Sequence, residues 1–239
     1  MSSIKGIIFD YGGTIDTNGI HWGELIWQEY CAAGIVIDKE IYREAYVHGE
    51  RSLAKAPIIE PTDTFRILLE KKMSIQFGFL RKRLPDYGLS RDKELEVAER
   101  CYSRVIETMK VTRSIVEMLS KEFPMVLVTN FYGNMPVVLQ EFGLNGYFKH
   151  IVESSVVGLR KPDPALFALG VEALGMRPEE IIVIGDSYRK DIYPSTQLGC
   201  HTVWIKNICW AEEPVETGHL PEAVIGTLEL LPETIKEHF

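Results

Sequence analysis

Three short, uninterrupted apolar runs stand out along the chain. They cover residues 6–9, 124–128 and 181–184. An apolar run without alternation is typical of a strand that is buried on both faces, as in a parallel sheet. Two further strands are predicted near the C-terminus, over 200–205 and 223–225, and helical patterns separate the runs, most clearly over 165–174. This alternation predicts an α/β fold with an open, doubly wound and mostly parallel sheet.

A long helical segment separates the first apolar run from the second. Its apolar residues recur at helical spacing over residues 21–33, 39–46, 63–73 and 92–109. We therefore predict a helical cap domain at residues 18–105, inserted into a Rossmann-like core formed by residues 1–17 and 106–239. Apolar positions between 111 and 119 predict a separate core helix that leads into the second strand.

Polar residues follow the three apolar runs at the points where the predicted strands end. Asp10 follows the first run, and Thr129 and Asn130 follow the second. Asp186 follows the third run after one glycine, and Lys161 lies in a turn-rich loop just before a helical pattern. Because ligands bind beyond the carboxyl ends of the strands in parallel sheets, we expect these side chains to converge there.

The order of these residues resembles that of the haloacid dehalogenase-like hydrolase superfamily. In that family a nucleophilic Asp is followed by a Thr, a Lys and an acidic pair. The corresponding residues here are Asp10, Thr129, Lys161, and Asp186 with Asp191. The resemblance covers all four family motifs and nearly the whole chain. It implies a Rossmann-like core, and the helical insertion resembles the cap of one large branch of the family.

The resemblance implies a magnesium-dependent hydrolase, which we interpret as a phosphatase acting on a small phosphorylated metabolite. Asp10 would attack phosphorus and form an aspartyl-phosphate. Mg²⁺ would be held by Asp10, the backbone carbonyl of Gly12 and Asp186. Lys161 would offset the charge of the nucleophile and of the phosphoryl group, whose oxygens Thr129 would bind.

Four neighbouring residues are open to more than one interpretation. Gly13 suits a loop whose backbone approaches the phosphate closely, which makes it a candidate for substrate binding. Asn130 supports the same loop or makes a structural hydrogen bond. Asp191 steadies the metal site, or else it caps a helix or forms an ion pair. Arg160 is as consistent with an exposed side chain as with a functional one.

One position departs from the family's pattern. Phosphatases of the family carry a second Asp two positions after the nucleophile, where it protonates the leaving group and then activates water. That position is Gly12 in this chain. A positioned general acid or base contributes about 10²–10⁴ in rate. A phosphatase would therefore need acidic leaving groups, or an acid borrowed from the substrate or from His21, His48 or Asp16.

Other interpretations of this glycine also follow from the family. Phosphonate-cleaving relatives carry Ala at this position and use a cap lysine, for which Lys55 is the candidate. Haloacid dehalogenases carry Tyr there, although the retained Asp186 is of a metal-binding type that a metal-free dehalogenase does not need. Alternatively, the chain is a non-catalytic module that binds a phosphorylated metabolite. Trp22, Arg51 and Tyr132 lie near the motifs and are candidates for contacts that set specificity.

Composition narrows the choice of partners and compartment. The chain has 239 residues, 46% of them hydrophobic, and a formal net charge of −8. That charge, without a basic stripe, argues against nucleic acid as a main partner. No apolar run has membrane-spanning length and the first strand begins within a few residues, so we expect neither a membrane span nor a signal peptide. The four cysteines form no Cys-x-x-Cys pair, which favours a cytoplasmic protein without a zinc site. The oligomeric state has no signature in the sequence.

Overall fold

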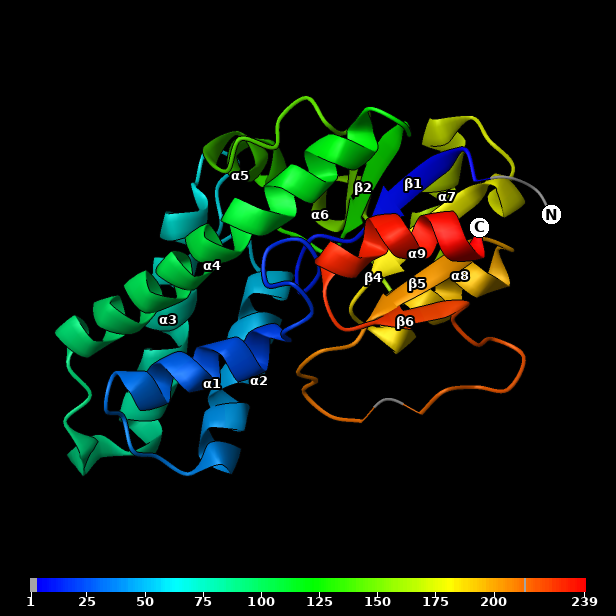
Figure 1. Ribbon diagram of the computed structural model, residues 1–239. Helices are drawn as coiled ribbons and strands as arrows, with labels where there is room; N and C mark the ends of the chain where they lie inside the picture. The colour runs from blue at the N-terminus through cyan, green and yellow to red at the C-terminus, as the bar shows by residue number, and fades with distance from the viewer. Residues whose placement is uncertain (1–3, 213) are drawn as a thin grey trace.

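The computed structural model describes residues 4–212 and 214–239. Their strands form one six-stranded parallel sheet in the order β3-β2-β1-β4-β5-β6 (Figure 1). The strands are β1 (Gly6–Phe9), β2 (Met125–Thr129), β3 (His150–Glu153), β4 (Ile181–Gly185), β5 (His201–Ile205) and β6 (Ala223–Ile225). Every residue of β1, β2 and β4 is buried, which explains why these strands are uninterrupted apolar runs. The predicted doubly wound α/β sheet is confirmed.

Helices cover both faces of this sheet. They are, in chain order, α1 (Trp22–Ala32), α2 (Lys39–Lys55), α3 (Phe65–Arg83), α4 (Arg91–Ser120), α5 (Met135–Glu141), α6 (Ser154–Val157), α7 (Pro164–Leu174), α8 (Tyr193–Gln197) and α9 (Leu231–His238). On β1, Ile7 and Phe9 join the core beneath α4, α5 and α9, whereas Ile8 points to the other face and packs with Phe167 of α7. None of these helices, within the described residues, is long and apolar enough to cross a membrane.

The helices α1 to α3, with the first half of α4, form a separate helical layer beside the sheet (Figure 1). This arrangement confirms the predicted helical insertion after β1. The Asp38 carboxylate and the Thr64 hydroxyl each accept backbone N–H groups in the first turns of α2 and α3, where a helix has no internal partners. Inside the layer, the ring centroids of Tyr42 and Phe77 each lie 5.2 Å from the ring centroid of Tyr30. Aromatic packing therefore gives the insertion its own core.

The prediction of a separate core helix near residue 111 was wrong. α4 runs unbroken for 30 residues, so the insertion and the core share it (Figure 1). Its buried residues keep helical spacing throughout, from Val97 and Cys101 beside the cap helices to Ile115 and Leu119 near the sheet. No glycine or proline interrupts it. The predicted domain boundary between residues 105 and 106 falls within this helix, and the domain bounds stay a prediction.

Strand β3 was missed because its sequence gives a weak apolar signal. Only two apolar residues lie between the His and the Glu that bound it, and its first two residues are not fully buried. It pairs with β2 alone, at the edge of the sheet. A short apolar pair of this kind does not distinguish a strand from a loop.

The centre of the sheet contains a topological switch point. β1 pairs with both β2 and β4, and the later strands extend the sheet outward on either side. Sheets of this kind open a crevice at the carboxyl ends of the strands where the order reverses. Asp10 follows β1, Thr129 ends β2 and Asp186 follows β4, so these residues meet at one cavity.

Gly170→Ala is expected to destabilise the protein, because α7 packs directly on the sheet at this residue. An added Cβ atom would lie 2.7 Å from Cγ2 of Val128 and 3.1 Å from Cδ1 of Ile8. Overpacking costs about 1–3 kcal/mol, which outweighs the gain in helix propensity, so the melting temperature should fall by a few degrees. Gly78→Ala in α3, where nothing lies within 4 Å of the added Cβ, is the matched control and should raise it slightly. Equal shifts in the two thermal melts would contradict this packing.

Candidate active site

Two carboxylates and one lysine form a buried ion cluster at the switch point. The Nζ atom of Lys161 lies 2.6 Å from Oδ1 of Asp10 and 2.7 Å from Oδ1 of Asp191. All three side chains are almost completely buried. Because a buried charge is tolerated only when it is paired, each member of this cluster fixes the position of the others.

Lys161 reaches the cluster because its backbone is tied to the end of β2. Its N–H donates to Oδ1 of Asn130 (2.9 Å), and Nδ2 of Asn130 donates to the carbonyl of Lys161 (3.2 Å). The ring of Phe167 lies beside the ammonium group, with its centroid 4.9 Å from Nζ. Asn130 thus has a structural role in presenting the lysine, and its predicted contact with substrate stays a prediction.

Asp10 is oriented by a hydroxyl that sequence reasoning missed. Oγ1 of Thr14 donates to Oδ2 of Asp10 at 3.2 Å. Burial raises the pKa of Asp10 to about 6, with Lys161 lowering it and Asp191 raising it further. Asp10 is therefore mostly ionised near neutral pH, as a nucleophilic carboxylate must be. The sequence does carry a signal for this role, because Thr14 places a hydroxyl in the loop after β1, shortly after Asp10.

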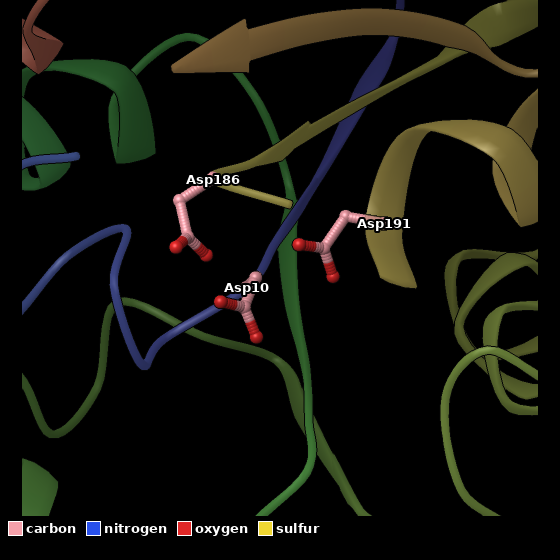
Figure 2. A group of neighbouring side chains, drawn as sticks. All are labelled: Asp10, Asp186 and Asp191. Atoms are coloured by element: carbon pink, nitrogen blue, oxygen red, sulfur yellow. The ribbon is translucent and has the colours of Figure 1, made fainter. Parts of the chain in front are cut away.

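Asp10, Asp186 and Asp191 together suit a divalent cation. One carboxylate oxygen from each lies within 4.8 Å of the others, and the three side chains converge in Figure 2. Burial raises the pKa of Asp186 well above its usual range, and the charges of Asp10 and Asp191 raise it further. Lys161 supplies one positive charge for three carboxylates. A hard divalent ion such as Mg²⁺ therefore fits both the oxygen donors and the charge.

Asp191 belongs to a short helical segment that follows β4, η3 (Tyr188–Ile192). The N–H of Ser187 donates to Oδ2 of Asp191 at 3.1 Å, while Oδ1 contacts Lys161. Ser187 is the N-cap residue of this segment, and the Asp191 carboxylate adds to the cap by accepting the N–H of Ser187. Asp191 forms an ion pair and lies in the carboxylate cluster. Gly185 makes room for it, since an added Cβ there would lie 2.4 Å from Cβ of Asp191.

The two glycines after the nucleophile differ in their surroundings. Gly13 has a φ of +99°, and an added Cβ would lie 2.3 Å from Oδ2 of Asp186, so only glycine fits. Its N–H donates to Oδ1 of Asp16 at 2.7 Å. Gly12 has no such constraint, because its φ is not positive and nothing lies within 4 Å of an added Cβ. Metal ligation by the carbonyl of Gly12 and phosphate contact by Gly13 stay predictions.

A cavity of about 120 Å³ adjoins the carboxylates, between the sheet and the helical insertion. Its core wall includes Asp10, Gly12, Thr129, Asn130, Tyr132, Arg160, Lys161, Asp186, Lys190 and Asp191. Its cap wall includes Trp22, Tyr46, Glu50, Phe65, Leu68, Leu69 and Lys72. The insertion therefore forms one wall of the site, and a ligand there would touch both parts of the chain.

Sequence reasoning missed an ion pair on the cap wall. Nζ of Lys72 lies 2.8 Å from Oε1 of Glu50, and the hydroxyl of Tyr132 donates to Oε2 of the same glutamate (3.3 Å). Burial alone would lower the pKa of Lys72, but the charge of Glu50 and the contact with Tyr132 raise it above its ordinary value. Lys72 is therefore protonated. Trp22 and Tyr132 both line the cavity, as proposed from the sequence. The centroid of the Trp22 ring lies 5.6 Å from Nζ of Lys72.

The other predicted candidates lie in different surroundings. His21 lines the cavity, but burial lowers its pKa to about 4, so it is neutral near pH 7. His48 and Arg51 line a separate pocket, and Lys55 lines another. Asp16 borders the cavity and is completely buried, and this burial raises its pKa to about 7.

The chain is similar in sequence to hydrolases and phosphatases. Residues 4–194 match the family model of the haloacid dehalogenase-like hydrolases. A phosphoglycolate phosphatase of Pectobacterium atrosepticum is 33% identical over 217 residues, which are 85% of this chain and 80% of that enzyme. A glyceraldehyde 3-phosphate phosphatase of Pyrococcus furiosus is 34% identical over 93 residues, 39% of each chain. The match spans less than half the length of this and several other curated relatives.

The fold is also similar to that of solved structures. One is a Bacillus subtilis protein, YfnB, described as a HAD hydrolase, whose crystal structure has magnesium bound. It superposes with a TM-score of 0.60 at 20% identity, over 98% of this chain and 99% of that chain. At this identity the likeness shows the shared fold, a Rossmann-like core with a helical insertion.

Asp186→Asn is expected to raise the melting temperature of the metal-free protein by a few degrees, because it removes one of three mutually repelling carboxylates. The same change should abolish most of the stabilisation that Mg²⁺ gives, since a ligand stabilises only the state that binds it. Thermal melts with chelator and with Mg²⁺ measure both effects. Asp92→Asn, at an exposed position in α4, is the control and should keep the Mg²⁺-dependent rise. An undiminished rise in the Asp186 variant would show that this cluster does not hold the ion.

Proposed function

The chain belongs to the haloacid dehalogenase-like hydrolase family, and on this basis we propose that it is a magnesium-dependent phosphatase acting on small phosphorylated metabolites. The observation that carries the proposal is the cluster of Asp10, Asp186 and Asp191 around Lys161, in a cavity that the cap lines on its other side. A carboxylate nucleophile, a countercharge and hard oxygen ligands are what transfer of a phosphoryl group to an aspartate requires.

Each residue at the floor of the cavity has a distinct role in the proposed reaction. Asp10 attacks phosphorus through its carboxylate, whose two oxygens are oriented by Lys161 and Thr14. Lys161 also offsets negative charge on the transferring group, and Thr129, which lines the cavity, binds its oxygens. Mg²⁺, held by Asp10, Asp186 and Asp191, would supply further positive charge at the phosphoryl oxygens.

Cavity size and sequence relatives support a small substrate. The cavity of about 120 Å³ is lined by bulky side chains, including Trp22 and Phe65. The Pectobacterium and Pyrococcus relatives are named for phosphoglycolate and glyceraldehyde 3-phosphate, which are both small phosphorylated metabolites. We infer a substrate of this size class.

Phosphonate cleavage through a cap lysine fits the site less well. Such cleavage uses a lysine that forms an imine with the substrate. Lys55, the candidate from the sequence, lines a different pocket, and the cap lysine that lines the cavity is Lys72. Formation of an imine needs an unprotonated amine. Glu50, 2.8 Å from Lys72, keeps that side chain protonated by raising its pKa.

Dehalogenation and simple binding are disfavoured by electrostatics. The three carboxylates have oxygens within 4.8 Å of one another, so they repel and destabilise the folded protein. A metal-free dehalogenase would not need this arrangement. A module that only binds a phosphorylated metabolite would gain nothing from the carboxylate of Asp10 facing an anionic ligand. A nucleophilic role for Asp10 accounts both for the crowding of the three carboxylates and for a carboxylate that faces an anionic ligand.

A screen of phosphate esters, phosphonates and 2-haloacids, each with Mg²⁺ and with chelator, tests the proposed function. Release of inorganic phosphate from small phosphate esters, dependent on Mg²⁺, is the expected result. Halide release that ignores chelator would instead assign the protein as a dehalogenase. Cleavage of phosphonates alone would assign it as a phosphonatase.

Asp10→Asn should lower the rate of phosphate release by roughly 10⁴-fold or more, because the amide is not an anionic nucleophile. The amide is nearly the size of the carboxylate, so the thermal melt should still show one cooperative transition. Phosphate release is measured on a substrate that the parent cleaves. Asp163→Asn, at the exposed N-cap of α7, is the control and should keep parental turnover. Equal activity in the Asp10 variant and its parent would remove Asp10 from the mechanism.

A further inference from the structure

We propose that Asp16 is the catalytic acid and base of this site, in place of the side chain that Gly12 lacks. This inference extends the proposed phosphatase activity and rests on it. Three observations carry it: where the Asp16 carboxyl lies, what holds it there, and the open space at Gly12.

The carboxyl of Asp16 lies beside the backbone of Gly12. Its Oδ1 atom accepts the N–H of Gly13 at 2.7 Å. A backbone nitrogen lies about 2.4 Å from the Cα of the preceding residue, so Oδ1 is within roughly 5 Å of the Cα of Gly12. A side chain at Gly12 would project into open space. Asp16 borders the same cavity as Asp10 and Gly12, and thus adjoins the space that the missing side chain leaves open.

Two N–H donors fix the orientation of this carboxyl. Nε1 of Trp22 donates to Oδ2 at 2.9 Å, and Gly13 donates to Oδ1. Each oxygen keeps a further site, so the group can also hold a proton. Burial raises the pKa of Asp16 to about 7, while the two donors lower it. Both the acid and its conjugate base are therefore populated near neutral pH, as the two steps of the reaction require.

The proposed reaction balances in two steps. In the first, Asp10 attacks phosphorus, the bond from phosphorus to the leaving oxygen breaks, and that oxygen takes the proton of Asp16. The products are an alcohol, a phosphorylated Asp10 and an ionised Asp16. In the second, Asp16 takes a proton from water as the water oxygen attacks phosphorus. The bond from phosphorus to Asp10 breaks, which releases inorganic phosphate and restores both side chains.

Asp16→Asn tests this assignment through the dependence of rate on the leaving group. With Mg²⁺ present, kcat/KM is measured for p-nitrophenyl phosphate and for an alkyl phosphate that the parent cleaves. The alkyl value should fall by about 10²–10⁴-fold, because an alkoxide needs the proton. The aryl value should fall by less than about tenfold, because p-nitrophenolate departs without one. The alkyl-to-aryl ratio is the readout, and a merely structural role would leave it unchanged.

Gly12→Asp provides a rescue, because a side chain fits at that position. Combined with Asp16→Asn, it should recover alkyl activity by at least about tenfold. In the parent it should gain little, because the acid is already present. The amide introduced by Asp16→Asn would place an NH₂ group against one of the two N–H donors. The series is therefore repeated in a Trp22→Phe background, which removes that donor, and each ratio measured there is compared with the ratio of Trp22→Phe alone.

The outcomes separate this inference from the proposed function. If the parent cleaves phosphate esters and Asp16→Asn leaves the ratio unchanged in both backgrounds, at a parental melting temperature, the assignment of Asp16 is overturned. An equal gain from Gly12→Asp in the parent and in the Asp16 variant would overturn it as well. A parent that cleaves no phosphate ester would remove the proposed function, and the assignment with it.

Discussion

The site depends on the contact of one buried lysine with two of three crowded carboxylates. Lys161 pairs with Asp10 and Asp191, and Asp186 lies close to both acids, its charge offset in part by Lys190. A parallel sheet brings acids from different strands to one edge, and their repulsion must then be offset there. Lys161 supplies part of that compensation, and the geometry leaves the rest to a divalent ion.

Several local features of the loops follow from this crowding. Gly13 and Gly185 lack side chains because Asp186 and Asp191 occupy the space that a Cβ would need. Asn130 ties the backbone of Lys161 to the end of β2, which keeps the ammonium group in reach of two acids from elsewhere in the chain. The glycines and the amide therefore act on the chemistry indirectly, by allowing charged groups to approach one another.

The cap adds a second, self-contained charge pair to the cavity. Lys72 and Glu50 neutralise each other, and Tyr132 of the core joins them, so the cap wall is linked to the core through a polar contact. Trp22 makes a comparable link through Asp16. Because these bonds are partly buried, they are stronger than they would be in water. The cavity and the position of Asp16 both depend on how the cap packs against the core.

The amino-acid sequence by itself determined the central strands and the residues at their ends. β1, β2 and β4 are buried on both faces, which requires apolar runs; Asp10 and Asp186 follow β1 and β4 directly, and Thr129 ends β2. The edge strand β3 could not be predicted, because two adjacent apolar residues do not distinguish a strand from a loop. The continuity of α4 could not be predicted either, because the helix packs first against the cap helices and then against the sheet, and the local pattern does not show that one helix spans both.

Only the tertiary structure decided which polar side chains share the cavity. Lys72 and Glu50 lie on different cap helices, and helical spacing does not say which face turns toward the sheet. Asp16 stood among several candidate acids until the turn after β1 brought its carboxyl against the N–H of Gly13. Local periodicity encodes burial, but contacts between residues far apart in the sequence are set by how whole elements pack.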